Sequence, residues 1–238
     1  MRGKTHCLEV WGDFACFTRP EMKVERFSYP VITPSAARGI FDAIYWKRSY
    51  GFYWQIEKVE ILSPPQYIAL RRNEVKGNVG MQEVSKWMKG KTEIEPFWAD
   101  DMDSDLKGRT QRQTMALKDV HYLLYAHMRF RNGVANVQDH DSQFLRRARH
   151  GKCFYQPFFG CREFPAYFEL VENTDVESGR ISRNYTNEIG IMAYDTFDLR
   201  KQNDEYSPQF ISVFRASVQG GVMKVPPYES LEVLKPEG

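Results

Sequence analysis

Two histidines lie on one face of the longest strand that the sequence predicts. Residues 115–131 alternate between apolar and mixed positions, and this two-residue period is that of a β-strand. One face carries Val120, Tyr122, Leu124, Ala126, Met128 and Phe130, and the other carries His121, Leu123, Tyr125, His127, Arg129 and Arg131. Histidine titrates near neutral pH, so His121 or His127 could transfer a proton in acid–base chemistry. Either ring could instead be a structural residue whose nitrogens are hydrogen-bonded.

Metal and cofactor motifs are absent from the sequence. It contains no Walker loop, Gly-x-Gly-x-x-Gly, His-Glu-x-x-His or Gly-x-Ser-x-Gly segment. The acids between Asp100 and Asp105 could attract a divalent cation, but such a run in a loop is more often solvated surface. Neither a Cys-x-x-Cys pair nor a zinc-finger spacing occurs among Cys7, Cys16, Cys153 and Cys161. We therefore expect neither a metal nor a cofactor.

Positive charge is clustered although the formal net charge is only +2. The clusters are Arg71-Arg72, Arg109 to Arg112, Arg129 with Arg131, and Arg146-Arg147 with Arg149. A modest net charge can conceal a basic face that holds phosphate groups, although for any one cluster a solvated surface is the simpler explanation. Aromatic residues make up 14% of the chain, and a surplus on the surface would suit stacking against nucleic-acid bases.

The composition is that of a globular protein. The chain has 238 residues, of which 42% are hydrophobic and 27% are charged. Its first four residues lead directly into a predicted strand without an apolar signal region, and no apolar run is long enough to cross a membrane. We therefore expect a cytoplasmic protein with reduced thiols and no membrane partner.

Strands and helices must position these residues. Residues 5–17 are predicted as a strand with Leu8 and Val10 on one face. A helix is predicted to begin with Thr33 as its N-cap and Pro34 at its first position, because apolar residues then follow at helical spacing. Further expected elements are strands at 52–62 and 67–72, helices at 81–88 and 141–149, a polar loop at 90–112, and an all-β segment after 154. The order strand, helix, strand, strand is compatible with a ferredoxin-like start.

Several blocks of sequence resemble those of one protein family. The blocks are Ala15 to Pro30, Thr33 to Ile40, Ile44 to Lys47, Ile68 to Glu74, Gln111 to Val120, and Phe159 to Ala166. Together they resemble the RAMP subunit of type I-C CRISPR systems, which is the d subtype of the fifth Cas family. The resemblance is specific because the blocks occur in the right order, from about residue 5 to about residue 217.

The resemblance implies both a fold and an activity. The fold would be α+β, with a ferredoxin-like (RRM-like) RAMP domain over residues 1–150 that holds the RNA site and a smaller β-rich domain over residues 151–238. The activity would be metal-independent cleavage of precursor CRISPR RNA at the repeat hairpin, after which the protein stays on the 5′ handle of the product. Its other partners would be the remaining subunits of the type I-C Cascade complex in antiviral defence. Non-specific binding of duplex DNA stays open.

The resemblance also implies which residues cut and bind the RNA. Cleavage without a metal uses the 2′-OH beside the scissile phosphate as the nucleophile, so it needs a base, an acid and a cation. The family centre matches Tyr45 on the first helix as the base, Lys118 as the cation, and His121 as the acid, with His127 as the alternative to His121. Without the resemblance, Tyr45 would be interpreted as a packing residue. The expected RNA contacts are Arg38, Lys47, Arg71, Arg72, Arg109 and Arg112.

Two other functions compete with this one. A non-catalytic Cascade subunit would only hold the 5′ handle, as relatives in other subtypes do. Such a subunit would not need a group of catalytic residues such as Tyr45, Lys118 and His121. A metal-dependent nuclease would use the acids at residues 100–105 and is the weakest of the three hypotheses.

Overall fold

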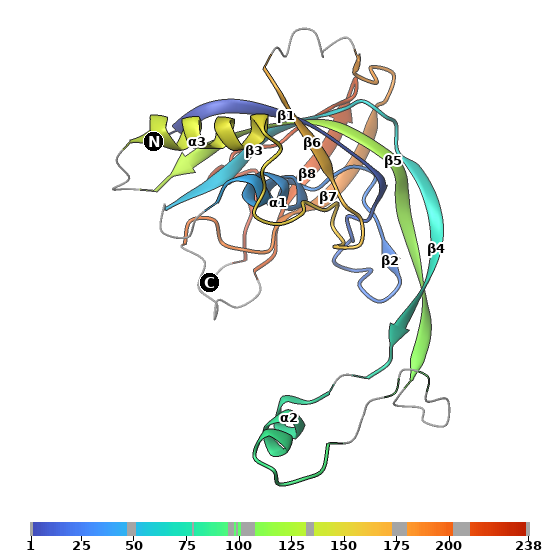
Figure 1. Cartoon of the computed structure of the whole chain (residues 1–238). Helices are drawn as coiled ribbons and strands as arrows, with labels where there is room; N and C mark the ends of the chain where they lie inside the picture. The colour runs from blue at the N-terminus through green and yellow to red at the C-terminus, as the bar shows by residue number, and fades with distance from the viewer. Residues whose placement is uncertain are drawn as a thin grey trace. The chain divides into compact units, whose positions relative to one another are not determined.

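The computed structural model describes residues 2–46, 51–77, 79–94, 98, 100, 108–131, 136–172, 180–201 and 210–236. The chain forms two compact units (Figure 1). The larger unit comprises Met1–Ile68 with Met115–Gly238, and the smaller unit comprises Ala69–Thr114. Among the described residues, no helix has the length and apolar character needed to cross a membrane.

The larger unit is built on an antiparallel sheet. Its main strands are β1 (Arg2–Ala15), β3 (Phe52–Ile61), β5 (Arg109–Phe130), β6 (Tyr167–Val171), β7 (Asn187–Asp195), β8 (Ser212–Gln219), β9 (Val222–Lys224) and β10 (Val233–Leu234). The hydrogen-bonded order is β10-β8-β9-β3-β5-β1-β6, while β7 pairs with β8 and the short β2 (Arg26–Phe27) pairs with β5. The helices of this unit are α1 (Pro34–Ile44) and α3 (Val137–Arg149). The predicted α+β class is therefore confirmed, with far more sheet than helix.

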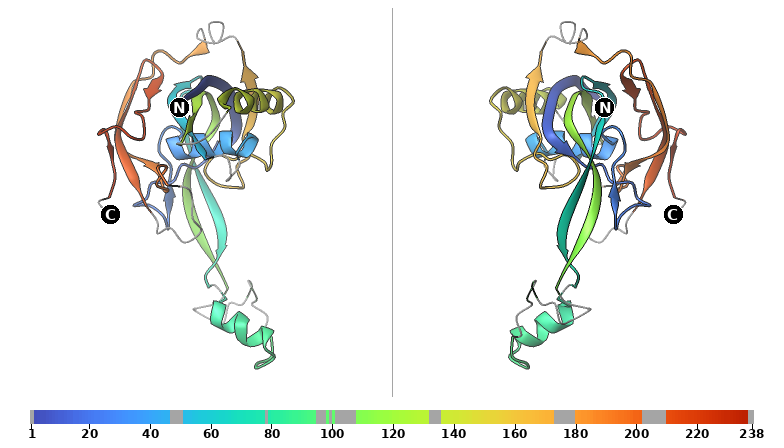
Figure 2. Two further views of the ribbon diagram at one scale, coloured as in Figure 1. Left: turned by 90° about the vertical axis from the view of Figure 1, so that its left-hand side faces the viewer. Right: turned by 90° about the vertical axis from the view of Figure 1, so that its right-hand side faces the viewer.

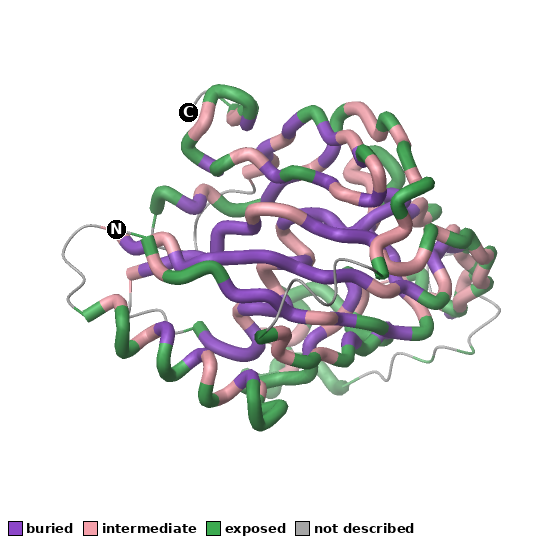
Figure 3. Tube along the Cα trace, turned by 90° about the horizontal axis from the view of Figure 1, so that it is seen from above, coloured by how far each residue is buried: buried purple, intermediate pink, exposed green. Residues whose placement is uncertain are grey.

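The alternation predicted for residues 115–131 is confirmed in β5. Leu124 pairs with Leu8 and Tyr122 with Val10, and all four side chains are buried. The same face of the sheet packs on the helices, as shown by the ring contact of His6 with Phe144 of α3 at 4.7 Å. Figure 3 shows the central strands as almost continuously buried, whereas α3 alternates between buried and exposed positions. His121 lies on the opposite face of β5, which we call the outer face.

Helix α1 begins where the sequence predicts. Thr33 has an extended backbone, its hydroxyl accepts a hydrogen bond from the amide of Ala36 at 3.3 Å, and Pro34 occupies the first turn. The buried residues of the helix include Ala37, Ile40, Phe41 and Ile44, as the helical spacing requires. The last helical residue is Ile44, and the next residue, Tyr45, is the C-cap and has an extended backbone. Helix α3 starts at Val137, one turn before the predicted start at residue 141.

The smaller unit is a two-stranded ribbon with a short helix. It contains most of β4 (Gln66–Val75), the start of β5, and α2 (Met81–Met88). The prediction of a loop through residue 112 is wrong, because β5 already begins at Arg109 and β4 pairs with it. The start of β5 was missed because few of its residues are apolar. In β4 and at the start of β5, exposed residues alternate with partly buried ones instead of with buried apolar ones. A narrow ribbon that buries little surface can be built from polar residues.

Strands on both sides of residue 150 share one sheet. Strand β6 pairs with β1, and β9 pairs with β3. The segment after residue 154 is mostly β, as predicted, and its strands β7 to β10 lie on the flank of the larger unit opposite α3, whereas β6 lies beside α3 (Figure 2). The predicted boundary at residue 150 therefore does not separate two sheets, and a domain division there stays a prediction.

Candidate active site

Tyr45 lies in an aromatic cluster at the end of α1. Its side chain is almost fully buried, with 3% of the residue exposed, and its ring stacks on Phe52 at 5.9 Å. The hydroxyl is hydrogen-bonded to Nδ1 of His140 at 2.9 Å, and the backbone carbonyl accepts a hydrogen bond from Trp54 Nε1 at 2.9 Å. Burial lowers the pKa of His140 below its ordinary value. These contacts anchor the end of α1 against β3 and α3.

His121 lies on the outer face of β5 and is open to solvent. Its Nε2 is 2.6 Å from Oε1 of Glu9, and 29% of its side chain is exposed. Trp11 pairs with it across the strands, with ring centroids 6.1 Å apart. An imidazole that is held by a carboxylate and still reaches solvent has the surroundings of an acid–base group.

Glu9 holds His121 and Arg180 together. Arg180 donates two hydrogen bonds to its carboxylate, at 2.8 and 3.0 Å. Burial raises the pKa of Glu9, but the hydrogen bonds and charges of Arg180 and His121 outweigh it, so the net pKa lies below its ordinary value. Glu9 is therefore ionised at neutral pH and can only accept hydrogen bonds. Consequently Nε2 of neutral His121 carries the proton, and its Nδ1 is free of a proton.

Exposed aromatic rings flank this histidine. Trp11 of β1 stacks on Tyr167 of β6 with centroids 6.2 Å apart and an interplanar angle of 28°. The two residues are 37% and 50% exposed. Exposed rings on the face of a sheet are a common platform for unpaired RNA bases.

Lys118 lies three residues before His121 on β5. It pairs with Phe14 of β1 and is partly buried. Asp119 between them has a φ of 51°, a left-handed conformation that interrupts the regular alternation of the strand. Lys118 and His121 therefore lie three positions apart near the middle of β5, which runs from Arg109 to Phe130.

Tyr45 is not brought together with these two residues. Its partner Phe52 pairs with Phe130, nine residues along β5 from His121, which corresponds to about 30 Å along a strand. Phe130 also lies on the helix-covered face, whereas His121 lies on the outer face. Tyr45 and His121 therefore cannot act on the same phosphate in this structure.

His127, the alternative histidine, is enclosed. It shares the outer face with His121, but its Nδ1 lies 2.6 Å from Oε1 of Glu57, which also accepts hydrogen bonds from Thr5 and Arg2. Burial lowers the pKa of His127, although the hydrogen bond and charge of Glu57 act in the opposite direction. His127 is therefore a less accessible proton-transfer group than His121.

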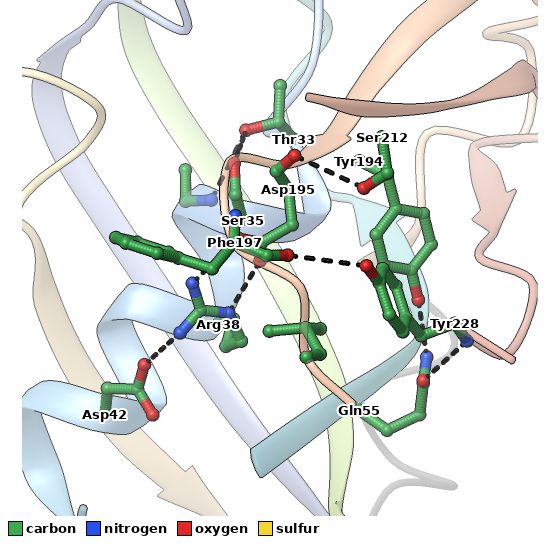
Figure 4. A network of polar contacts seen from close by, with 12 residues as sticks. Thr33, Ser35, Arg38, Asp42, Gln55, Tyr194, Asp195, Phe197, Ser212 and Tyr228 are labelled. Carbon is green, nitrogen blue, oxygen red and sulfur yellow. Dashed lines mark hydrogen bonds and ion pairs between the residues drawn. The ribbon is translucent and has the colours of Figure 1, made fainter. Parts of the chain in front are cut away.

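Arg38, an expected RNA contact, lies in a buried ion network (Figure 4). Its guanidinium donates two hydrogen bonds to Asp195, at 2.7 and 3.1 Å, and one to Asp42 at 2.5 Å. Burial raises the pKa of Asp42 to about 6, against the opposing charge of Arg38. Arg38 therefore joins α1 to the end of β7, and its hydrogen bonds are directed to protein carboxylates.

The other expected RNA contacts lie in the smaller unit or outside the described residues. Arg71 and Arg109 are exposed, and Arg72 and Arg112 are partly buried. Arg109 lies 3.4 Å from the exposed carboxylate of Asp100. Lys47 lies outside the described residues, as do the acids at 101–105. In the part of the chain that the structure describes, no group of three His, Cys, Asp or Glu side chains is placed to hold a metal ion.

Glu9, Trp11, Tyr167 and Arg180 were missed by sequence reasoning. The alternation in β1 places Glu9 and Trp11 on the face opposite Leu8 and Val10, so these two residues could have been predicted to lie together on the outer face. Tyr167 and Arg180 had none, because both meet β1 through contacts that are distant in sequence; Arg180 and Glu9 are 171 residues apart.

Known proteins resemble this chain along nearly its whole length. A family model described as a CRISPR-associated protein of the Cas5d type matches residues 5–226. Two curated relatives are each called "CRISPR pre-crRNA endoribonuclease Cas5d". The relative from Mannheimia succiniciproducens is 42% identical over 95% of this chain and 96% of its own length. The relative from Thermus thermophilus is 37% identical over 90% of this chain and 82% of its own length.

Solved structures show the same fold at lower identity. A crystal structure of a CRISPR-associated protein has a TM-score of 0.66 and 20% identity, with 98% of both chains covered. A chain of a CRISPR RNA-guided surveillance complex has a TM-score of 0.50 and 15% identity, covering 98% of this chain and 92% of that one. The match of the family model and the two relatives above 30% identity together show that this chain belongs to the Cas5d family of CRISPR-associated proteins.

Proposed function

We propose that this chain is the endoribonuclease that cuts precursor CRISPR RNA at the repeat hairpin. The observation that carries the proposal is the 42% identity with a pre-crRNA endoribonuclease over 95% of the chain. In this proposal the protein acts in the cytoplasm, keeps the 5′ handle of its product, and joins the other subunits of a type I-C Cascade complex. The partly exposed imidazole of His121 provides the accessible proton-transfer group that such a cut requires.

The reaction begins with the RNA's own 2′-OH. That oxygen attacks the adjacent phosphorus, the bond to the 5′-oxygen of the next nucleotide breaks, and the upstream product ends in a 2′,3′-cyclic phosphate. Nδ1 of His121 accepts the proton of the 2′-OH, because Glu9 fixes the ring with its proton on Nε2. The same ring then gives a proton to the leaving 5′-oxygen, so protons and electrons balance without a metal.

Cations and rings near His121 complete the proposed site. Lys118 and Arg180 carry positive charge that would counter the crowded phosphate. The ring pair of Trp11 and Tyr167 would stack the unpaired bases beside the cut. Glu9 acts through His121 and is a positioning residue.

Tyr45 with His140 forms an alternative centre. The pair has a hydrogen bond between two titratable groups, and Tyr45 lies in one of the blocks that resemble the family. We favour His121 because Tyr45 is buried among aromatic rings. If Tyr45 were the base, the cation beside it would have to come from residues other than Lys118.

The first part of the chain fits a ferredoxin-like domain in this proposal. Leaving aside β2, β4 and α2, the elements β1, α1, β3, β5, α3 and β6 follow the order strand, helix, strand, strand, helix, strand. Their strands lie in the antiparallel order β6-β1-β5-β3, which is the ferredoxin-like order. Because β6 is its fourth strand, such a domain would extend at least to Val171, and the smaller β-rich part would follow it.

Cleavage should not need a divalent metal. We expect the pure protein to cut its own repeat RNA in EDTA at the rate seen with magnesium, because the proposed proton transfers use side chains only. The measurement is a single-turnover time course with and without EDTA. Loss of cutting in EDTA that magnesium restores would contradict the mechanism, and binding without cutting in both conditions would favour a subunit that only holds the 5′ handle.

The arginines of the smaller unit should bind phosphate groups. We expect the double variant Arg71→Ala, Arg72→Ala to bind repeat RNA more weakly. The slope of log affinity against log salt concentration should become shallower by roughly 0.7 to 0.9 for each phosphate that is no longer neutralised. Duplex DNA of unrelated sequence should show the same change if it binds through the same arginines. Filter binding at several salt concentrations tests both, with Arg200→Ala, which lies in the larger unit, as the control. An unchanged slope would show that Arg71 and Arg72 do not contact the RNA.

A further inference from the structure

A cavity of about 550 Å³ opens beside the start of α1. It is lined by the segment after β1, by the first turns of α1, by Phe158 and Gly160, and by residues that follow β7. This volume lies within the range of roughly 300–1,000 Å³ that is usual for small-molecule sites. None of Glu9, Trp11 and His121 lines it, so it is separate from the surface proposed for the cut.

The lining of this cavity contains three basic side chains. It includes Arg19, Lys23 and Arg38 but no Asp or Glu, in the part of the chain that the structure describes. Lys23 is exposed, and the guanidinium of Arg19 lies 4.7 Å from the centroid of the Tyr29 ring and 3.7 Å from the carboxylate of Glu21. The first turn of α1 adds the positive end of a helix dipole. The charge of Arg38 is balanced by Asp195 and Asp42, so Lys23 and Arg19 provide the positive charge that favours an anionic ligand.

Aromatic rings supply the apolar part of the wall. Phe17 is buried, Phe158 is partly buried, and Phe197 is 45% exposed. A flat ring beside positive charge is the combination that proteins use to hold a nucleotide, with the base on the ring and the phosphate on the cations.

Phe197 lies beside the buried ion network (Figure 4). The amide of Phe197 donates a hydrogen bond to Oδ1 of Asp195 at 3.0 Å, and its ring lies 5.9 Å from the guanidinium carbon of Arg38. Asp195 is bound in turn by two hydrogen bonds from Arg38. The network thus holds the backbone of Phe197 at the cavity wall, and a preordered wall loses less conformational entropy when it binds a base.

We propose that this cavity binds one unpaired nucleotide of the CRISPR RNA. Its base stacks on Phe197, and its phosphate lies near Lys23 and Arg19. The inference rests on the proposed function, because that function supplies the RNA. It adds a second point of attachment, distinct from the cleavage surface, at which a single nucleotide outside the hairpin stem is held.

The test is a binding cycle between the protein and RNAs that lack single bases. One abasic position is placed at each unpaired nucleotide of the cleaved repeat RNA, and affinities are measured for the wild type and for Phe197→Ala. We expect one abasic RNA to bind the wild type roughly 5- to 100-fold more weakly than intact RNA. Phe197→Ala should weaken intact RNA by a similar factor but should weaken that abasic RNA no further.

Matched controls separate the possible outcomes. Phe154→Ala removes an exposed ring outside the cavity, and Phe197→Tyr keeps a ring in it; both should bind intact RNA like the wild type. If Phe197→Ala weakens all the RNAs equally or not at all while the wild type still cuts, the cavity proposal fails alone. If the wild type neither binds nor cuts repeat RNA, the proposed function fails with it. If adenosine monophosphate alone binds the cavity but Phe197→Ala leaves RNA affinity unchanged, the site serves free nucleotides and the proposal is overturned.

Discussion

Replacement of His121 by Ala should slow single-turnover cleavage of repeat RNA by roughly a hundredfold or more, as expected for the loss of a proton-transfer group. The ring is partly exposed, and its Nε2 lies 2.6 Å from Oε1 of Glu9. RNA affinity should change little, because Lys118, Arg180 and the ring pair of Trp11 and Tyr167 remain in the variant. The measurement is the cleavage rate at saturating protein, taken together with the dissociation constant of each variant.

Tyr45→Phe and His127→Ala are the matched controls for this result. Phe keeps the stacking on Phe52 and loses only the hydrogen bond to His140, so the rate should fall by no more than a few-fold. His127→Ala should retain cleavage because its ring is enclosed beside Glu57. If Tyr45→Phe is inactive while His121→Ala cuts normally, the centre lies at Tyr45 and His140. If only His127→Ala is inactive, the outer face is right and the histidine is wrong.

Replacement of Asp195 by Asn should destabilise the protein by about 3–5 kcal/mol, the usual cost of breaking a buried ion pair. Asp195 is buried, accepts two hydrogen bonds from Arg38, and also holds the amide of Phe197. Urea unfolding at neutral pH gives the free energy. Glu229→Gln removes an exposed partner of Arg129 and should cost less than about 1 kcal/mol. Equal small losses in the two variants would show that the network adds little to stability.

Because of Asp42 in the same network, the free energy of unfolding of the protein should fall as pH rises. Its pKa is raised from 3.8 to about 6, first by burial, and its Oδ1 has no hydrogen-bond partner among the described residues. Between these two values the folded state binds more protons than the unfolded state, so stability is lost as pH rises from about 4 to about 6. We expect Asp42→Asn to remove this loss, which would be up to about 3 kcal/mol. A wild-type-minus-variant difference that does not change with pH would contradict this assignment.

Local patterns were sufficient for the elements that position the proposed site. The N-cap Thr33 with Pro34 located the start of α1, and the two-residue period located the buried length of β5. Local patterns failed to predict the strand at Arg109 to Arg112, because a ribbon that buries little surface has no regular spacing of apolar residues. They also failed to join β6 to β1, since strand pairing across a long sequence separation leaves no local signature.

The proposed site was only half visible in the sequence for the same reason. His121 and Lys118 share one strand, so their nearness follows from local order. Tyr45 was grouped with them through the family resemblance, yet it stacks on Phe52, which pairs with Phe130 at the end of β5, nine residues from His121. Arg38 was expected at the RNA; its partner Asp42 lies four residues later on the same helix, but its second partner Asp195 became apparent only when β7 was placed beside α1.

The most direct test of the central claim is made on the RNA itself. A single 2′-deoxy nucleotide is placed immediately upstream of the mapped cut, and wild-type protein is incubated with this RNA and with the all-ribose RNA in EDTA. The account predicts that the deoxy RNA binds with unchanged affinity and is not cut, and that the all-ribose RNA gives an upstream product ending in a 2′,3′-cyclic phosphate. Cleavage of the deoxy RNA at the normal rate, or an upstream product with a free 3′-hydroxyl, would contradict it.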